Sequence, residues 1–284
     1  LSDVIGNISP EDTPILSYIG RGPKLQGTFW EWQQDSLAAA STTNKHIEGD
    51  DVAAFEAVVP TVRLGNYAQI SRKTLIVSET EEEIEKAGRK SEIAYQKAKL
   101  SAEIKLDMEA TICSNQVAAA GSSGVARATG ALLATIKSNT NIGASGADPV
   151  WTTVPNAART DGTQRSFTEA QLKDVLAQCF DAGASPKIVM LGAFNKQVAS
   201  TFTGIASRTL QQTNAKVTAI IGAADVYVGD FGQVAFVPNR VQRARDAFVI
   251  DPEYVRLRYL RKHKWVKLAK TGDADKAFLR CEWG

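Results

Sequence analysis

A long stretch without proline constrains this chain more than any other feature. From residue 79 to about residue 115 there is no proline, and the one interior glycine is Gly88. Ser78 and Glu81 fit the N-cap and third helical positions of a capping box. One helix over this stretch would be roughly 55 Å long at 1.5 Å per residue. Because an average helix has only about 11–12 residues, we expect a structural spine rather than a helix wrapped inside a compact core.

The chain before this helix reads as an arm followed by a hairpin. Residues 1–24 are rich in Gly, Pro, Asp and Ser, which predicts an extended arm rather than part of a core. The alternation around Trp30 and Trp32 places both side chains on one face of a strand. A weakly patterned polar stretch at 36–57 separates that strand from a second extended stretch at 58–77. The pattern predicts a long hairpin-like excursion.

The chain after the helix predicts an α/β unit followed by strands. Thr168 and Gln171 form a second capping box, and apolar residues follow at helical spacing up to a stop at Gly183. A buried strand at 187–191 and a helix at 193–203 complete the unit. A hairpin over 225–237 and further strands follow, at 247–250, 255–260 and 265–268.

Composition excludes several classes of protein. The 284 residues include 33 Lys and Arg against 31 Asp and Glu, so the net charge of +2 is close to neutral. No apolar run approaches the ~20 residues of a membrane span, so we expect no membrane partner. Cys113, Cys179 and Cys281 lie far apart and are expected to be buried hydrophobes. His46 and His263 are too few for most metal or triad chemistry. We therefore predict no catalytic residue, no cofactor and no metal site.

Charge is unevenly distributed along the chain. Residues 240–270 hold ten basic residues against three acidic ones, which makes this stretch +7 and the rest of the chain −5. Such a stretch is either a solvated, ion-paired face of a sheet or a surface that attracts polyanions or acidic subunits. The candidate basic-interface or genome-facing residues are Arg240, Arg243, Arg245, Arg256 and Arg258.

The arm and the hairpin indicate an assembly. An extended arm and a long two-stranded excursion cannot cover their own edges and tryptophan faces. We therefore expect other copies of the chain to cover them.

The order of arm, long hairpin, spine helix, α/β unit and returning strands, together with local sequence, resembles one known family. The segments that carry the resemblance are GNISPEDTP (6–14), EWQQDSLAAA (31–40), IEGDDVA (47–53), LGNYAQISRKT (64–74), DVYVGDFG (225–232), VPNRVQRARDAFVIDPEY (237–254) and LAKTGD (268–273). Across nearly the whole chain they resemble the major capsid proteins of tailed bacteriophages, which have the Hong Kong ninety-seven-like fold.

The resemblance implies an α+β fold in five parts. These are an N-terminal arm at 1–24, an extended loop at 25–77 that reaches a neighbouring subunit, a spine helix of the peripheral domain at 78–119, an α/β axial domain at 120–232 and peripheral strands at 233–284.

The resemblance also implies a function and partners. The chain would assemble as pentamers and hexamers into an icosahedral head shell around non-specifically held double-stranded DNA. It would belong to the virion after assembly in the host cytoplasm, with scaffold, portal and cement proteins as candidate further partners. Tryptophan and charged side chains of the loop and nearby strands would set contact register. The candidate subunit-interface residues are Trp30, Trp32, Asp50, Asp51, Arg63, Arg72 and Lys73.

Three alternatives stay open. A cargo-enclosing compartment shell would share the fold and differ in its contents. A soluble enzyme built on the α/β unit at 168–203 would be a monomer or a small oligomer with a concave site. A nucleic-acid-binding module centred on 240–270 would bind DNA tightly as an isolated subunit, which a near-zero net charge disfavours.

Overall fold

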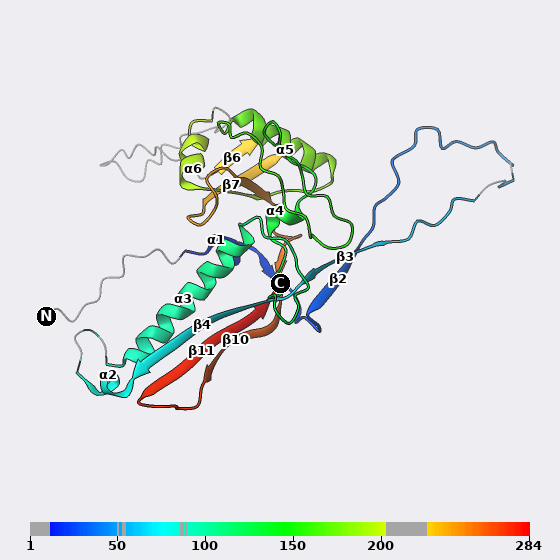
Figure 1. Cartoon of the computed structure of the whole chain (residues 1–284). Coiled ribbons are helices and arrows are strands. Elements are labelled where there is room, and N and C mark those ends of the chain that lie inside the picture. Colours follow the sequence, from blue (N-terminus) through cyan, green and yellow to red (C-terminus); the bar gives the residue numbers. More distant parts are fainter. Residues whose placement is uncertain (1–11, 50, 53–54, 86–87, 89, 203–225) are drawn as a thin grey trace, which may run out of the picture.

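The structure, a computed structural model, describes residues 12–49, 51–52, 55–85, 88, 90–202 and 226–284. Figure 1 shows two packed units with a long loop projecting from the region between them. We call α3 with strands β4, β10 and β11 the spine unit, and α5 and α6 with strands β5 to β8 the α/β unit.

The long helix is divided in two, so the prediction of one helix over 79–115 was wrong. Helix α2 spans Glu79–Glu83 and helix α3 spans Glu92–Ile112. Between them Gly88 has a φ of +80°, a left-handed conformation that ends helical geometry and that glycine adopts without steric strain. The rigid spine is therefore α3 alone.

Side-chain caps account for both helix starts. The Ser78 hydroxyl accepts the Glu81 N–H, as the sequence predicts. The Ser91 hydroxyl does the same for α3 by accepting the Ala94 N–H. The Glu82 carboxylate turns back to accept the backbone N–H groups of Glu92 at 2.9 Å and Ile93 at 3.1 Å. The acidic first helix therefore caps the second one.

The spine unit is a three-stranded antiparallel sheet packed on α3 (Figure 1). Its order is β10 (Tyr259–Lys267), β11 (Ala274–Trp283) and β4 (Gln69–Ser78). All ten residues of β11 pair with β4. The sheet face that meets α3 is apolar, and its core residues include Ile104, Met108, Leu279, Cys281 and Trp283.

The described part of the arm packs into the core, unlike the extended arm that the sequence predicts. Helix α1 (Pro14–Tyr18) buries Ile15 completely, and β1 (Gly20–Arg21) pairs in parallel with β9 (Arg256–Leu257). Proline and glycine indicated an extended stretch, but the apolar residues between them supply enough area to dock on α3. Residues 1–11 lie outside the described residues.

The hairpin prediction is confirmed at its base. Strand β2 (Phe29–Gln34) pairs antiparallel with β3 (Val62–Tyr67). Trp30 and Trp32 share a face, with ring centroids 5.0 Å apart. The expected extended stretch at 58–77 is divided at Ala68, because β4 leaves the hairpin to join the spine unit.

The α/β unit contains a four-stranded sheet in the order β6-β7-β5-β8. Its elements are α5 (Glu169–Asp181), β5 (Ile188–Leu191), α6 (Ala193–Ala199), β6 (Val226–Gly229), β7 (Gly232–Pro238) and β8 (Ala247–Ile250), with the short α4 (Leu132–Thr135) nearby. The resemblance assigned all strands from 233 onward to the peripheral domain. Strands β7 and β8 instead flank β5, because their buried side chains complete the core under α5 and around β5.

Local signals in this unit are confirmed. Thr168 and Gln171 form the reciprocal capping box at the start of α5. At its end Gly183 has a φ of +80°, and the N–H groups of Gly183 and Ala184 bond the carbonyls of Phe180 and Cys179. The hairpin of β6 and β7 turns at Gly229–Gly232, as predicted, while Asp225 lies outside the described residues.

Candidate subunit-interface surfaces

The loop between β2 and β3 carries apolar side chains into solvent. Figure 1 shows the described residues of this loop, 35–49, 51–52 and 55–61, projecting away from both units. Leu37 is 99% exposed, Val58 is 93% exposed and Phe55 is 89% exposed. The sequence of this loop holds five acidic residues against Lys45, a net charge of −4 with His46 neutral: Asp35, Glu48, Asp50, Asp51 and Glu56. An exposed segment that is both apolar and acidic marks an interaction surface.

Sequence reasoning missed the apolar character of this loop. The stretch at 36–57 was interpreted as a polar tip, because its apolar residues follow neither helical nor strand periodicity. The number of apolar residues in this stretch, and not their spacing, was the feature that could have revealed its apolar character. The strongly exposed apolar residues of the loop are Leu37, Ile47, Val52, Phe55, Val58 and Val59.

The two predicted interface tryptophans are partly engaged within the chain. Trp30 and Trp32 are half-buried, and the Arg258 guanidinium lies 5.5 Å from the centre of the Trp30 ring. The backbone of Arg258 exchanges two hydrogen bonds with Gly284, at 2.9 and 3.0 Å. The tryptophan face thus holds the base of the hairpin against the spine unit. Its role between subunits stays a prediction.

The other predicted interface residues lie in different places. Arg63 on β3 and Asp51 in the loop are exposed, whereas Asp50 lies outside the described residues. On β4, the Lys73 ammonium pairs with Asp107 of α3 at 2.7 Å, so Lys73 joins the sheet to its own spine helix. Arg72 points to the opposite, solvent-facing side of the sheet.

The predicted basic residues do not form one free cationic face. The Arg243 guanidinium pairs with Asp161 at 2.6 Å and Asp246 at 2.7 Å, and Arg245 pairs with Asp161 at 3.5 Å. Burial raises the pKa of Asp246, partly opposed by the charge of Arg243.

The remaining basic candidates lie elsewhere on the surface. Arg240 pairs with Asp12 at 3.4 Å, whereas Arg256 is exposed on the two-residue strand β9. Arg258 follows β9 and turns toward Trp30. A DNA-facing role for these arginines stays a prediction.

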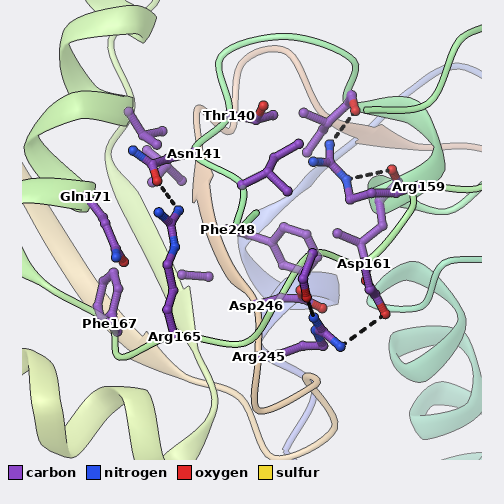
Figure 2. A pocket seen from close by; sticks show the side chains of 18 of the residues that line it. Thr140, Asn141, Arg159, Asp161, Arg165, Phe167, Gln171, Arg245, Asp246 and Phe248 are labelled. Carbon is purple, nitrogen blue, oxygen red and sulfur yellow. Dashed lines mark hydrogen bonds and ion pairs between the residues drawn. The ribbon is translucent and has the colours of Figure 1, made fainter. Parts of the chain in front are cut away.

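A cavity of about 370 Å³ lies in the α/β unit, between α5, β8 and the loops at 138–143 and 159–165 (Figure 2). Its polar side chains contact one another: the Arg165 guanidinium donates a hydrogen bond to the Asn141 side-chain oxygen, and Arg245 forms an ion pair with Asp161. Phe167 and Phe248 supply apolar wall. Within the described ranges, no group of three or more His, Cys, Asp or Glu side chains is arranged to hold a metal ion.

The three cysteines are buried and free, as the sequence predicts. Burial raises the pKa of Cys113 to about 12 and that of Cys281 to about 12. Both side chains pack in the core of the spine unit as thiols. As for membranes, none of the helices in the described part of the chain combines the length and apolarity that a bilayer span requires.

We expect the stability of the subunit to fall as pH decreases below about 6.5, partly through His263. Burial, Lys105 and Arg21 lower the pKa of His263. A histidine with a lowered pKa in the folded state binds fewer protons there than in the unfolded chain, so acid favours unfolding. Urea unfolding at pH 7.5 and at pH 5.5 measures how much the free energy of unfolding falls between the two pH values. This fall should be smaller in the variant His263→Gln. An equal fall in the variant and the wild type would contradict a contribution from His263.

Comparison with known proteins shows which family this chain belongs to. A family model described as SU10 major capsid protein matches residues 1–284. The major capsid protein of Escherichia phage Phieco32 is 31% identical over 235 residues, which cover 72% of this chain and 65% of that protein. The match therefore spans slightly less than two thirds of the length of that relative.

Solved phage structures share the fold. The Cyanophage A-1(L) capsid asymmetric unit matches with a TM-score of 0.66 at 12% identity, over 100% of this chain and 91% of that one. A structure from Microbacterium phage Oxtober96 matches with a TM-score of 0.61 at 13% identity, over 99% and 86%. The prediction of an α+β, Hong Kong ninety-seven-like fold is confirmed.

Proposed function

Because this chain belongs to the SU10 major capsid protein family, we propose that it is the subunit of an icosahedral phage head shell. Pentamers and hexamers of the chain would form this shell around double-stranded DNA that is held without sequence specificity. The role is structural and not enzymatic, and the protein belongs to the virion after assembly in the host cytoplasm. Scaffold, portal and cement proteins are further proposed partners.

The exposed apolar loop at 35–61 is the observation that carries this proposal. A free subunit would leave Leu37, Phe55 and Val58 in water, whereas a second copy can cover them. Interfaces of roughly 1,000 Å² or more would be modest one at a time and large when summed over a closed shell. Trp30, Trp32, Asp50, Asp51 and Arg63 lie on or near this loop and are proposed contact residues.

The five parts of the chain have separate proposed roles. Residues 1–24 are the N-terminal arm, the spine helix within 78–119 belongs to the peripheral body, and the extended loop within 25–77 reaches a neighbour. The α/β unit within 120–232 gathers at the centre of each pentamer or hexamer. The sheet order supports moving strands β7 and β8, up to Ile250, into this axial part, which leaves the later strands of 233–284 in the peripheral body.

Removing the loop should abolish assembly and leave the subunit folded. We expect the full chain to form uniform shells, or rings of five and six subunits, in negative-stain electron microscopy. A variant in which residues 36–60 are replaced by a short Gly-Ser linker should keep the β2–β3 pairing, because this pairing ends at Gln34 and Val62. Light scattering and circular dichroism then measure size and fold. A wild-type chain that stays a monomer at every concentration and with added scaffold would refute the proposal.

A further inference from the structure

The hairpin of β2 and β3 needs support from the rest of the chain to hold one direction. Its two strands form a sheet of their own, separate from the three-stranded sheet of the spine unit. An isolated two-stranded hairpin is only marginally stable in water. Each arm of its loop, about fourteen residues, reaches at most roughly 45 Å, so a tilt of about 5° at the base moves the tip by about 4 Å. The base therefore decides where the loop points.

An asparagine on β3 binds the base of the hairpin to the chain that follows α3. We call residues 113–131, between α3 and α4, the connector. The Gly130 N–H donates to Asn66 Oδ1 at 2.8 Å, and Asn66 Nδ2 donates to the Gly130 carbonyl at 3.3 Å. Asn66 is only 7% exposed. We call this arrangement an amide clamp, because one amide side chain bonds both backbone groups of a single residue, as a neighbouring strand would.

A second amide clamp binds the same connector to the α/β unit. Asn115 Nδ2 donates to the Arg159 carbonyl at 2.7 Å, and the Arg159 N–H donates to Asn115 Oδ1 at 3.0 Å. The Arg159 guanidinium then donates to the carbonyls of Leu133 at 3.3 Å and Ile136 at 2.6 Å. Arg159 lies in the loop that lines the cavity of the α/β unit (Figure 2). The connector is thus bound to the hairpin at Gly130 and to the α/β unit at Asn115.

The segments around the first clamp are packed without spare room. A Cβ atom at Gly130 would lie 2.5 Å from Pro155 Cγ and 3.4 Å from the Ala118 Cβ. The Ala118 N–H donates to the Pro155 carbonyl, and the Gly65 N–H on β3 donates to the Thr153 carbonyl, both at 2.8 Å. Because packed interiors transmit strain, a displacement of the loop at 153–155 is passed on to the hairpin.

The connector also binds the point at which the chain leaves the hairpin for the spine sheet. Gln116 Nε2 donates at 2.6 Å to the side-chain oxygen of Gln69, the first residue of β4. On the side of the spine unit, the hairpin has the contact of Arg258 with the Trp30 ring. A cation is attracted to a ring face anywhere within about 6 Å of its centre, so this contact constrains an angle less than hydrogen bonds do.

We propose that Asn66 and Asn115 are positioning residues for the loop at 35–61. Through the connector, their amide clamps fix the direction of the hairpin relative to the α/β unit. A loop that already points in its bound direction loses less conformational freedom when it meets another copy. It also meets every copy at the same angle, which a closed shell of one size requires. This consequence for shell size rests on the proposed assembly function.

The distance between two spin labels on one chain measures the direction of the hairpin. Gln34→Cys at the end of β2 and Ala170→Cys on α5 place labels at exposed sites, whereas the three native cysteines are buried and should stay unlabelled. Excess unlabelled chain restricts the measurement to pairs within one copy. The chain with both clamps should give one narrow distance peak. Asn66→Ala and Asn115→Ala should each lose this peak and give a broad distribution.

Asn195→Ala is the matched control, because it separates positioning from stability. Asn195 on α6 is also 7% exposed, and its Nδ2 donates to the Ala244 carbonyl at 2.9 Å within the α/β unit. All three variants should lower the thermal midpoint by roughly 2–4 °C. The two clamp variants should in addition form particles of several diameters in negative-stain electron microscopy, whereas Asn195→Ala should form uniform ones. Equal broadening of the distance peak in Asn195→Ala would indicate general loosening and would overturn the inference.

Gly130→Ala tests the same path without removing a clamp. The bonds of Asn66 use the backbone of residue 130 and remain, but the added Cβ displaces Pro155. The distance peak should therefore move and stay narrow. An unmoved peak here, with narrow peaks in both clamp variants, would mean that Asn66 and Asn115 serve stability alone. The label distance is measured within one copy, so it decides this inference whether or not particles form. A wild-type chain that never assembles would refute the shell function instead.

Discussion

Glu109→Ala is expected to lower the free energy of unfolding of the subunit by about 3 kcal/mol, because it breaks a buried hydrogen-bond network. The Glu109 carboxylate on α3 has no exposed surface. One oxygen, Oε1, accepts the Ile15 N–H and the Asn239 side-chain N–H, both at 2.8 Å. The other, Oε2, accepts the Leu16 N–H at 3.0 Å. One side chain therefore joins the arm, the spine helix and the chain that follows β7.

The five-residue helix α1 depends on this distant carboxylate. Thr13 at its N-cap makes no side-chain hydrogen bond, so Glu109 satisfies N–H groups that a cap would otherwise bind. Burial raises the pKa of Glu109, and the hydrogen bonds from Ile15, Leu16 and Asn239 oppose that rise. Alanine removes the buried charge as well as its bonds, so the net loss is smaller than three bonds to a charged group would suggest.

Urea unfolding measures this loss, and amide hydrogen exchange locates it. Exchange at Ile15 and Leu16 should accelerate more than exchange in the α/β unit. Glu109→Gln should also destabilise, because its amide group faces N–H donors with one acceptor oxygen instead of two. Glu103→Ala, at a partly exposed acid on the same helix, is the matched control and should change little. Equal stability of Glu109→Ala and this control would contradict the network.

Glu282→Ala is expected to reduce stability by about 2–3 kcal/mol, because it leaves two arginines without their shared acid. The Glu282 side chain is 3% exposed, and its oxygens face Arg127 and, at 2.7 Å, Arg261. The arginines retain access to water, which keeps the loss below that of a fully buried pair.

The loss should be local as well as global. Arg127 lies in the loop after α3 and Arg261 in the irregular part of β10, so exchange of backbone amides should increase in both segments. Glu253→Ala, at an exposed acid that pairs with Lys187, should behave as wild type in the same urea series. Arg127→Ala and Arg261→Ala can then be added to the Glu282→Ala variant. If the triple variant regains most of the free energy of unfolding that Glu282→Ala lost, the loss came from the two arginine charges left without their acid. No restoration would mean that Glu282 acts through packing.

Features set by neighbouring residues could be predicted from the sequence. The capping box of Thr168 and Gln171, the stop at Gly183 and the shared face of Trp30 and Trp32 follow from local rules. The division of the long helix had a visible signal in Gly88 followed by Ser91. It was missed because one glycine inside a helical pattern is usually tolerated. Glu82, which caps α3 from the preceding helix, decides the outcome.

Features set by distant residues could not be predicted. The pairing of Lys73 with Asp107 and the contact of Trp30 with Arg258 join segments that only the fold brings together. The alignment of Arg72 on β4, Arg280 on β11 and Lys264 on β10 depends on the registers of three strands from two ends of the sequence, so it could not be predicted. The burial of α1 was hidden for the same reason, since Glu109 lies more than ninety residues away.

The pairing of β4 with β11 also sets an order of events in folding. Ser78 meets Ala274 and Gln69 meets Trp283, so the partners are separated by roughly two hundred residues of chain. During synthesis α3 and the α/β unit emerge before β11, and Ile104 and Met108 must wait for the central strand that covers them. Contacts of such long range close slowly and leave apolar surface open meanwhile. A newly made subunit therefore passes through a partly folded state with exposed apolar surface. In this state premature association with other chains competes with completion of the fold.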